Sequence, residues 1–287
     1  MPEKVKIIEC PRDAMQGIKS FIPTERKIAY IQSLLGCGFD TIDFGSFVSP
    51  RAIPQMADTA EVLSNLDLTN SKSKLLAIVA NVRGANEASL YHNIDYLGYP
   101  FSISENFQMR NTHKTIAQSI NILSDILEIA QATNKEVVTY VSMGFGNPYG
   151  DPWSVEVVGE WTEKLAEMGA RILSLSDTVG SSTPEDISYL FTHLIPKYPQ
   201  VEFGAHLHTT PGKWHEKIDA AYKAGCRRFD GAIKGFGGCP MARDELTGNM
   251  PTEKMLSYFT ENKVDTGVQW MVFEAAYNKA SELFSSY

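Results

Sequence analysis

Two histidines one residue apart, His206 and His208, have the spacing that a metal ion requires. They follow Val201 and Phe203, in an apolar run that is typical of a β-strand. Residues i and i+2 of a strand point to the same face, so both imidazoles would converge on one point. The pair alone also fits two hydrogen-bonded polar side chains at a strand end. The elements around it must decide between these interpretations.

Length and composition are those of an ordinary globular protein. The chain has 287 residues, of which 43% are hydrophobic and 21% charged, and a net charge of -8. This charge argues against nucleic acid or an anionic membrane as a partner, and no apolar run is long enough to span a bilayer. The N-terminus has no apolar signal region, and the cysteines show no paired spacing (Cys10, Cys37, Cys226 and Cys239). We therefore expect a cytoplasmic protein without disulfides.

Short β-rich runs alternate with amphipathic helical stretches along the chain. We predict strands over residues 5–9, 41–44, 74–80, 136–142, 171–175, 201–206 and 227–229, with another inside 94–104. Predicted helices follow these strands; one opens at Asp151-Pro152 and another is capped by Thr183. Eight such units, with no Gly-rich dinucleotide fingerprint and no phosphate-binding loop, favour a (β/α)8 TIM barrel. We expect one catalytic barrel domain over residues 1–287, with a C-terminal loop and helical extension.

In a TIM barrel the active site lies at the carboxyl ends of the strands. Asp13 follows the first predicted strand, the two histidines end the seventh, and Asn249 lies in the last loop. A carboxylate, two imidazoles and an amide oxygen leave positions open for water or substrate. Such mixed ligation suits Mg²⁺ or Mn²⁺, with Zn²⁺ as an alternative.

Two further residues have chemistry that suits such a site. Arg12, beside Asp13, is either part of a surface ion pair or a cation facing the developing charge of a substrate. Cys239 follows the glycines of the 235–238 stretch. It is either a small buried residue or a thiol that transfers a proton from a loop that can move. Lys19 is a solvated side chain unless it faces an acidic substrate group.

At these residues the sequence resembles the 3-hydroxy-3-methylglutaryl-CoA (HMG-CoA) lyase family, in the metal-dependent lyase and Claisen-condensation superfamily of TIM barrels. The resemblance covers roughly residues 4–285. Pro11-Arg12-Asp13 with Gln16 resembles the family's PRDGLQ motif, and residues 235–240 resemble its GxGGCP loop. The other matching segments are residues 46–50 with 54–56, 140–142, 176–180, the two histidines and 248–249.

The resemblance implies a retro-Claisen cleavage that releases acetyl-CoA and acetoacetate. The implied metal ligands are Asp13, His206, His208 and Asn249. Arg12 would stabilise the enolate, His206 or Asp13 would be the base, and Cys239 would be the proton donor. Asp43 would belong to the catalytic set. Lys19 would hold the distal carboxylate and Asn81 would contact the CoA arm.

Several positions depart from the family pattern. Asp43 stands where the family has Glu, and Thr209 replaces the acid of its HxHDT motif. Cys10 directly precedes Pro11 where the family has Gly, Ala14 replaces another Gly, and one residue is inserted between Cys239 and Asn249. The exact 3-hydroxyacyl-CoA substrate therefore stays open. Two alternatives are an acetyl-CoA-dependent condensing acyltransferase, against which the cysteine loop argues, and a catalytically altered paralogue that binds metal or CoA. Barrels of this kind often form homodimers, but the sequence does not fix the oligomeric state.

Overall fold

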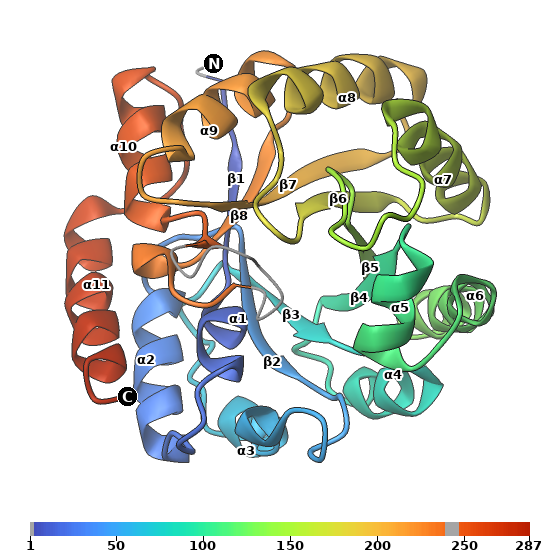
Figure 1. Cartoon of the computed structure of the whole chain (residues 1–287). Helices are drawn as coiled ribbons and strands as arrows, with labels where there is room; N and C mark the ends of the chain where they lie inside the picture. The colour runs from blue at the N-terminus through green and yellow to red at the C-terminus, as the bar shows by residue number, and fades with distance from the viewer. Residues whose placement is uncertain (1–2, 239–246) are drawn as a thin grey trace.

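The computed structural model describes residues 3–238 and 247–287, and its main feature is a closed barrel of eight parallel strands (Figure 1). Neighbours in the chain pair with one another, and β1 pairs with β8 to close the ring. This confirms the predicted (β/α)8 TIM barrel. The strands are β1 (Lys6–Glu9), β2 (Thr41–Ser46), β3 (Lys74–Ile78), β4 (Tyr96–Ser102), β5 (Glu136–Ser142), β6 (Ile172–Asp177), β7 (Glu202–Thr209) and β8 (Arg228–Gly231).

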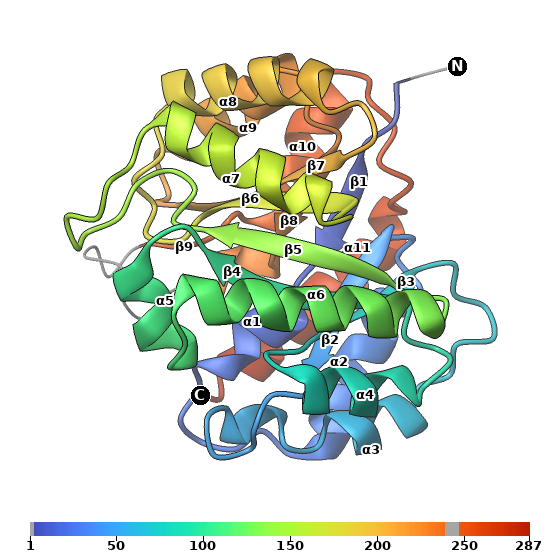
Figure 2. The same cartoon turned by 90° about the vertical axis from the view of Figure 1, so that its right-hand side faces the viewer.

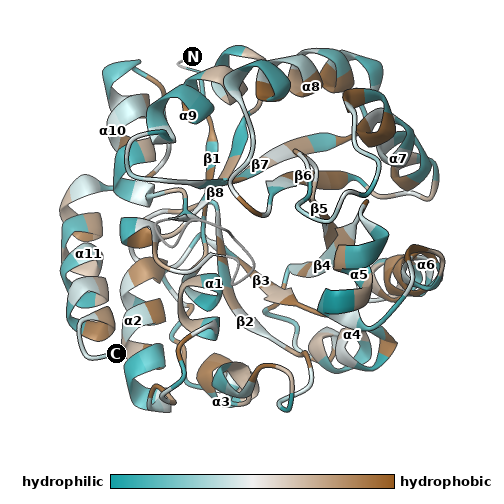
Figure 3. Ribbon diagram, viewed as in Figure 1, coloured by the Kyte–Doolittle hydropathy of each residue, from teal (hydrophilic) through white to brown (hydrophobic). Residues whose placement is uncertain are grey.

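A helix follows each barrel strand and covers the outside of the barrel, as the view turned by 90° also shows (Figure 2). These helices carry apolar and polar stretches side by side (Figure 3), as expected of elements with one buried and one exposed face. They are α2 (Thr24–Leu35), α3 (Thr59–Ser64), α4 (Val82–Ser89), α6 (Ile116–Ala132), α7 (Val155–Glu167), α8 (Pro184–Lys197), α9 (Trp214–Lys223) and α10 (Thr252–Glu261). Within the described residues, no helix is both long and apolar enough to cross a membrane.

The remaining elements decorate this barrel. The last helix, α11 (Trp270–Phe284), lies outside α2, where Phe284 packs edge-on against Tyr30 at 5.9 Å between ring centroids (Figure 1). Helix α11 forms the expected C-terminal helical extension. The other additions are α1 (Pro11–Gln16), η1 (Pro54–Met56), α5 (Glu105–Thr112), η2 (Ile233–Gly235) and β9 (Gly248–Asn249).

One helix begins at a residue other than the one predicted. Helix α7 starts after Ser154, whose side chain accepts a hydrogen bond from the Val157 amide, rather than at Asp151. The Asp151 carboxylate is occupied elsewhere, because it accepts hydrogen bonds from the Asn106 amide (3.0 Å) and side chain (2.6 Å). Tertiary contacts therefore override a local start signal.

Helix α1 was not predicted, and it matters for the site. Pro11 occupies its first turn, where a missing amide hydrogen costs nothing. Residues three and four apart on a helix lie on one face, so α1 brings Arg12, Asp13 and Gln16 together. The polar residues after β1 are therefore placed by a helix and not by a loop.

Glu9, at the end of β1, is fully buried and binds the two segments that flank the last loop, η2 before it and α10 after it. Its carboxylate accepts hydrogen bonds from the Ile233 amide (2.9 Å) and the Thr252 hydroxyl (2.6 Å). Burial raises the pKa of Glu9 to about 8, against an ordinary value of 4.5. Between these two pH values the folded protein keeps a proton that the unfolded chain has released.

We expect the free energy of unfolding to fall by about 1.4 kcal/mol per pH unit over this range because of Glu9. Glu9→Gln keeps the size of the side chain and its contacts but does not titrate, so it should remove this slope. Urea unfolding at pH 5, 6, 7 and 8 measures the effect. Glu87→Gln, on the exposed face of α4, is the control and should keep the slope. An unchanged slope in Glu9→Gln would contradict the assignment.

Candidate active site

A cavity of about 320 Å³ opens at the carboxyl ends of the barrel strands. It contains polar residues from α1 and from the ends of β5, β6 and β7. A larger cavity of about 420 Å³ lies beside it, but no acidic residue or histidine is among its described lining residues. The side chains that could bind a metal ion or transfer a proton therefore line the first cavity. Its polar lining residues are Arg12, Asp13, Gln16, Asn111, Thr112, Tyr140, Ser142, Ser176, Thr178, His206 and His208.

Asp13, His206 and His208 form a cluster that has the composition of a metal site. Their ligand atoms lie within 4.8 Å of one another, and the two imidazole centroids are 5.3 Å apart. Nε2 of His208 is buried and has no hydrogen-bond partner in the described part of the chain. A buried nitrogen lone pair without a donor is costly unless it binds something. The donor set of one carboxylate and two imidazoles therefore fits a divalent cation.

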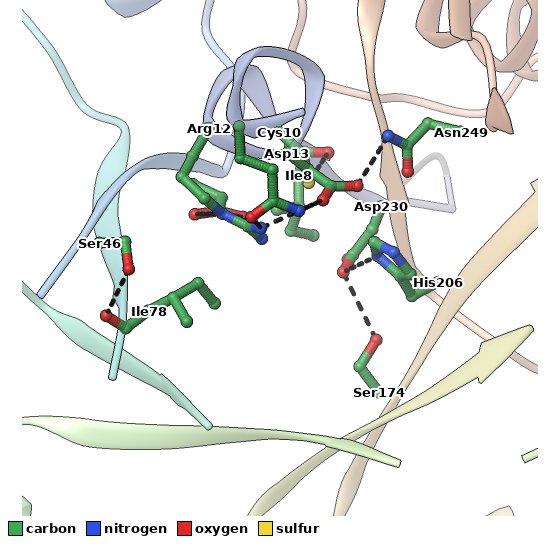
Figure 4. A network of polar contacts seen from close by, with 12 residues as sticks. Ile8, Cys10, Arg12, Asp13, Ser46, Ile78, Ser174, His206, Asp230 and Asn249 are labelled. Carbon is green, nitrogen blue, oxygen red and sulfur yellow. Dashed lines mark hydrogen bonds and ion pairs between the residues drawn. The ribbon is translucent and has the colours of Figure 1, made fainter. Parts of the chain in front are cut away.

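Each imidazole is oriented through its other nitrogen. Nδ1 of His206 lies 3.2 Å from Oδ2 of Asp230, on β8 (Figure 4). Nδ1 of His208 lies 3.0 Å from the carbonyl oxygen of Thr178. Such outer contacts fix which nitrogen faces a bound metal. A carboxylate from the neighbouring strand therefore orients His206, and a backbone carbonyl orients His208.

Asn249 lies beside the cluster because β9 pairs antiparallel with β7, with Asn249 opposite His208. Its amide nitrogen donates hydrogen bonds to Oδ2 of Asp13 (2.7 Å) and to the carbonyl of Phe236 (2.8 Å). The sequence suggested its amide oxygen as a ligand. In the structure the nitrogen faces Asp13, so Asn249 holds that carboxylate in place (Figure 4).

Arg12 is held by carboxylates on both sides. Its guanidinium donates two hydrogen bonds to Oδ2 of Asp43, at 2.5 and 3.1 Å, and one to Oδ1 of Asp13, at 3.1 Å. Gln16 accepts a further bond from Nη1 at 3.0 Å and donates to Asp13 at 2.5 Å. The guanidinium is therefore fixed at the edge of the cavity. Asp43 is fully buried behind it and does not line the cavity.

Burial and neighbouring charges shift the pKa values of these groups in opposite directions. Burial alone would raise the pKa of Asp13, but Arg12 and the two histidines outweigh it, and the pKa is lowered. Burial raises the pKa of Asp43 to about 6, with Arg12 limiting the shift. The pKa of His206 is raised, because Asp230 and Asp13 outweigh burial, whereas burial and the neighbouring His206 lower that of His208.

Of the glycines before Cys239, Gly237 packs closely against α1. Gly237 has a φ of +84°, and a Cβ atom there would lie 2.6 Å from the carbonyl oxygen of Asp13. A side chain at Gly237 would therefore push the loop away from the cluster. Gly238 lines the cavity, and Cys239 itself lies outside the described residues.

Two residues suggested for substrate binding do not line the cavity. Lys19 follows α1 and its side chain is exposed. Asn81 caps α4, where its side chain accepts a hydrogen bond from the Gly84 amide at 2.9 Å. Ala80, next to it, does line the cavity.

The sequence interpretation missed two buried groups beneath the cluster. Asp230 lies opposite His206 in the β7–β8 register. In the sequence it is only a polar residue near the end of a strand, and the register that places it beside His206 is not visible there. Cys10 has ligand atoms within 4.8 Å of those of His206 and Asp230. Burial and the nearby carboxylates raise the pKa of the Cys10 thiol well above its ordinary value, so Cys10 stays protonated.

The rest of the cavity wall is mostly apolar. It therefore offers a surface for the carbon skeleton of a ligand, while the cluster offers cationic and hydrogen-bonding groups for its oxygen atoms. The apolar residues of this wall are Val48, Ala52, Ile53, Ile78, Ala80, Pro100 and Phe107.

Sequence and structure comparisons place these features in a family. Residues 4–278 match the family described as HMGL-like. The mitochondrial hydroxymethylglutaryl-CoA lyase of Mus musculus is 33% identical over 279 residues, which cover 93% of this chain and 82% of that protein.

Solved structures give the same result. The HMG-CoA lyase of Brucella melitensis superposes with a TM-score of 0.91 at 32% identity, over 98% of this chain and 99% of that one. The HMG-CoA lyase of Acinetobacter baumannii, solved with coenzyme A and 3-methylmalate, superposes with a TM-score of 0.89 at 29% identity, over 98% and 92% of the two chains. The protein belongs to the HMGL-like family and is a carbon–carbon lyase of the hydroxymethylglutaryl-CoA lyase type.

Proposed function

We propose that this protein is a divalent-metal-dependent lyase that cleaves 3-hydroxy-3-methylglutaryl-CoA to acetyl-CoA and acetoacetate. The observation that carries the proposal is the fixed guanidinium of Arg12 next to the cluster of Asp13, His206 and His208, at the carboxyl end of a TIM barrel. The names of the relatives support the substrate, and the coenzyme A in the A. baumannii structure supports an acyl-CoA ligand.

Asp13, His206 and His208 would hold Mg²⁺ or Mn²⁺, with Asn249 as the fourth suggested ligand and Zn²⁺ as an alternative ion. The cation would lower the pKa of the tertiary hydroxyl of the substrate. Asp13 and His206 are the two groups placed to accept the hydroxyl proton. Of these, His206 has the raised pKa and the better basicity.

Loss of the hydroxyl proton converts the C–O bond to the ketone of acetoacetate and breaks the bond between C2 and C3. The electron pair moves into the thioester as an enolate of acetyl-CoA. Arg12 would then stabilise the enolate oxygen, because Asp43, Asp13 and Gln16 already hold its guanidinium in place before the negative charge develops. Asp43 acts as a positioning residue, because it holds Arg12 from behind. A proton from Cys239 completes the reaction at C2.

Cys239→Ala should lower kcat by roughly 10²-fold, because a positioned proton donor contributes about this much. The affinity for Mn²⁺ should stay near that of the wild type, since the thiol is not among the proposed ligands. Single-turnover assays and a Mn²⁺ titration measure the two effects. Cys37→Ala, at a buried cysteine that follows α2 and does not line the cavity, is the control. An unchanged kcat would remove Cys239 from the mechanism.

A panel of 3-hydroxyacyl-CoA esters, assayed with and without divalent metal, tests the proposal against its alternatives. Cleavage of HMG-CoA above the other esters supports it. Release of CoA thiol from acetyl-CoA and an α-keto acid would instead indicate a condensing acyltransferase, and tight binding without turnover an altered paralogue. Because Asp43 and Thr209 depart from the family pattern, a related 3-hydroxyacyl-CoA ester is the next substrate to consider if HMG-CoA is not cleaved.

We further propose a cytoplasmic location, with a homodimer as the oligomeric state to test.

A further inference from the structure

A buried lysine, Lys217, links the carboxyl end of β6 to that of β7, the strand that carries His208. It lies on α9, next to β7 (Figure 1), and its side chain is only 1% exposed. Its ammonium group donates hydrogen bonds to Oδ2 of Asp177 (2.7 Å), the carbonyl of His208 (2.8 Å) and the carbonyl of Gly180 (3.2 Å). All three ammonium hydrogens can therefore be satisfied, as a buried lysine requires.

These three acceptors lie at the end of the β6–β7 pairing or just beyond it. The last residue pair in the β6–β7 register is Asp177 with Leu207. His208 and Thr178 lie one residue beyond it. On its other side His208 is held by β9 through Asn249. On the β6 side, the hydrogen bonds of Lys217 take the place of the strand ladder.

The residue that directly follows β6 orients the imidazole of His208. The carbonyl of Thr178, which directly follows Asp177, lies 3.0 Å from Nδ1 of His208. Asp177 is fixed from its other side by Ser182, whose hydroxyl and amide donate to it at 2.5 and 3.2 Å. Lys217 thus connects the backbone of His208 with the Asp177-Thr178 segment, whose carbonyl lies within hydrogen-bond distance of the His208 ring.

We propose that Lys217 is a positioning residue for His208 and thereby sets the affinity of the site for its divalent cation. This inference rests on the metal dependence of the proposed function. A buried ion pair is a poor source of stability, because an apolar replacement of similar volume is often neutral or stabilising. The geometry gives this pair another role: it fixes the direction of a ligand, as outer-shell contacts do in metal sites.

Lys217→Met removes the ammonium and keeps the length of the side chain. The matched control is Lys27→Met, on α2. Lys27 is equally buried and donates to Asp58 at 2.7 Å and to the carbonyl of Gln55, but it lies outside the candidate site. Mn²⁺ is titrated into the metal-free full-length proteins, and free Mn²⁺ is followed by electron paramagnetic resonance.

We expect the Mn²⁺ Kd of Lys217→Met to rise about 10-fold, whereas that of Lys27→Met stays within about 2-fold of the wild type. At saturating Mn²⁺, Lys217→Met should regain most of the wild-type kcat. An unchanged Kd in folded Lys217→Met, or an equal rise in Lys27→Met, would overturn the proposal. If Lys217→Met does not fold, Lys217→Gln replaces it under the same criterion. A wild-type protein that binds Mn²⁺ but does not cleave HMG-CoA would contradict the proposed function alone.

Discussion

Replacing Arg12 with methionine is expected to lower kcat for HMG-CoA cleavage by roughly 10³-fold, the effect of removing a preorganised group that stabilises an oxyanion. Arg12 is 8% exposed and is held at once by Asp43, Asp13 and Gln16. Apart from the two histidines, no other cationic side chain is among the described residues that line the cavity. The substrate KM should change less than kcat, because the enolate charge develops only in the transition state. Steady-state kinetics separate the two constants.

Arg12→Lys keeps the charge but loses the planar fork that binds Asp43 through Nε and Nη2. It should therefore recover only part of the rate. Arg83→Met, at an exposed ion pair on α4, is the control and should have wild-type kinetics. Urea unfolding accompanies the assay, since Arg12→Met leaves Asp43 buried and unpaired at a cost of about 3–5 kcal/mol. If the folded Arg12→Met protein kept kcat within about 10-fold of the wild type, Arg12 would not act on the enolate.

The second large effect is expected at His208. His208→Ala should raise the Kd for Mn²⁺ by at least about 100-fold, because loss of an outer-shell partner alone typically costs 10- to 100-fold and this change removes a ligand. Activity at ordinary Mn²⁺ concentrations should fall in parallel. Isothermal titration of the metal-free protein measures the affinity directly.

His193→Ala is the matched control, because His193 is an exposed histidine on α8 that stacks on Tyr189. It should bind Mn²⁺ as the wild type does. A wild-type Kd in His208→Ala would show that the ion binds elsewhere and would remove the cluster of Asp13, His206 and His208 from the account.

The barrel was predictable from the sequence because its signals are local. Each strand is a short apolar run and each helix an amphipathic stretch, and eight repeats of this pattern leave few alternatives. Element boundaries failed where a distant residue competed for a side chain. Asp151 has the sequence position of a helix start, but its carboxylate is bound by Asn106 from a helix more than 40 residues away. No local pattern contains that contact.

The site was predictable to the extent that its residues follow strand ends. The i, i+2 spacing of His206 and His208 and the position of Asp13 after β1 brought all three to one end of the barrel, where the structure clusters them. The contacts that orient them were not predictable. Lys217 looks like a solvent-facing residue of an amphipathic helix, and Asp230 becomes visible only when the register of β7 and β8 is known.

The most direct test of the central claim is a product assay on the purified protein with HMG-CoA, before and after removal of divalent metal. Acetoacetate and acetyl-CoA should form in equal amounts with Mg²⁺ or Mn²⁺ present. Cleavage should cease after chelation and return when the ion is restored. Cleavage that persists in chelator would contradict the metal-dependent mechanism, and absence of both products from the metal-loaded protein would contradict the assignment of HMG-CoA as substrate.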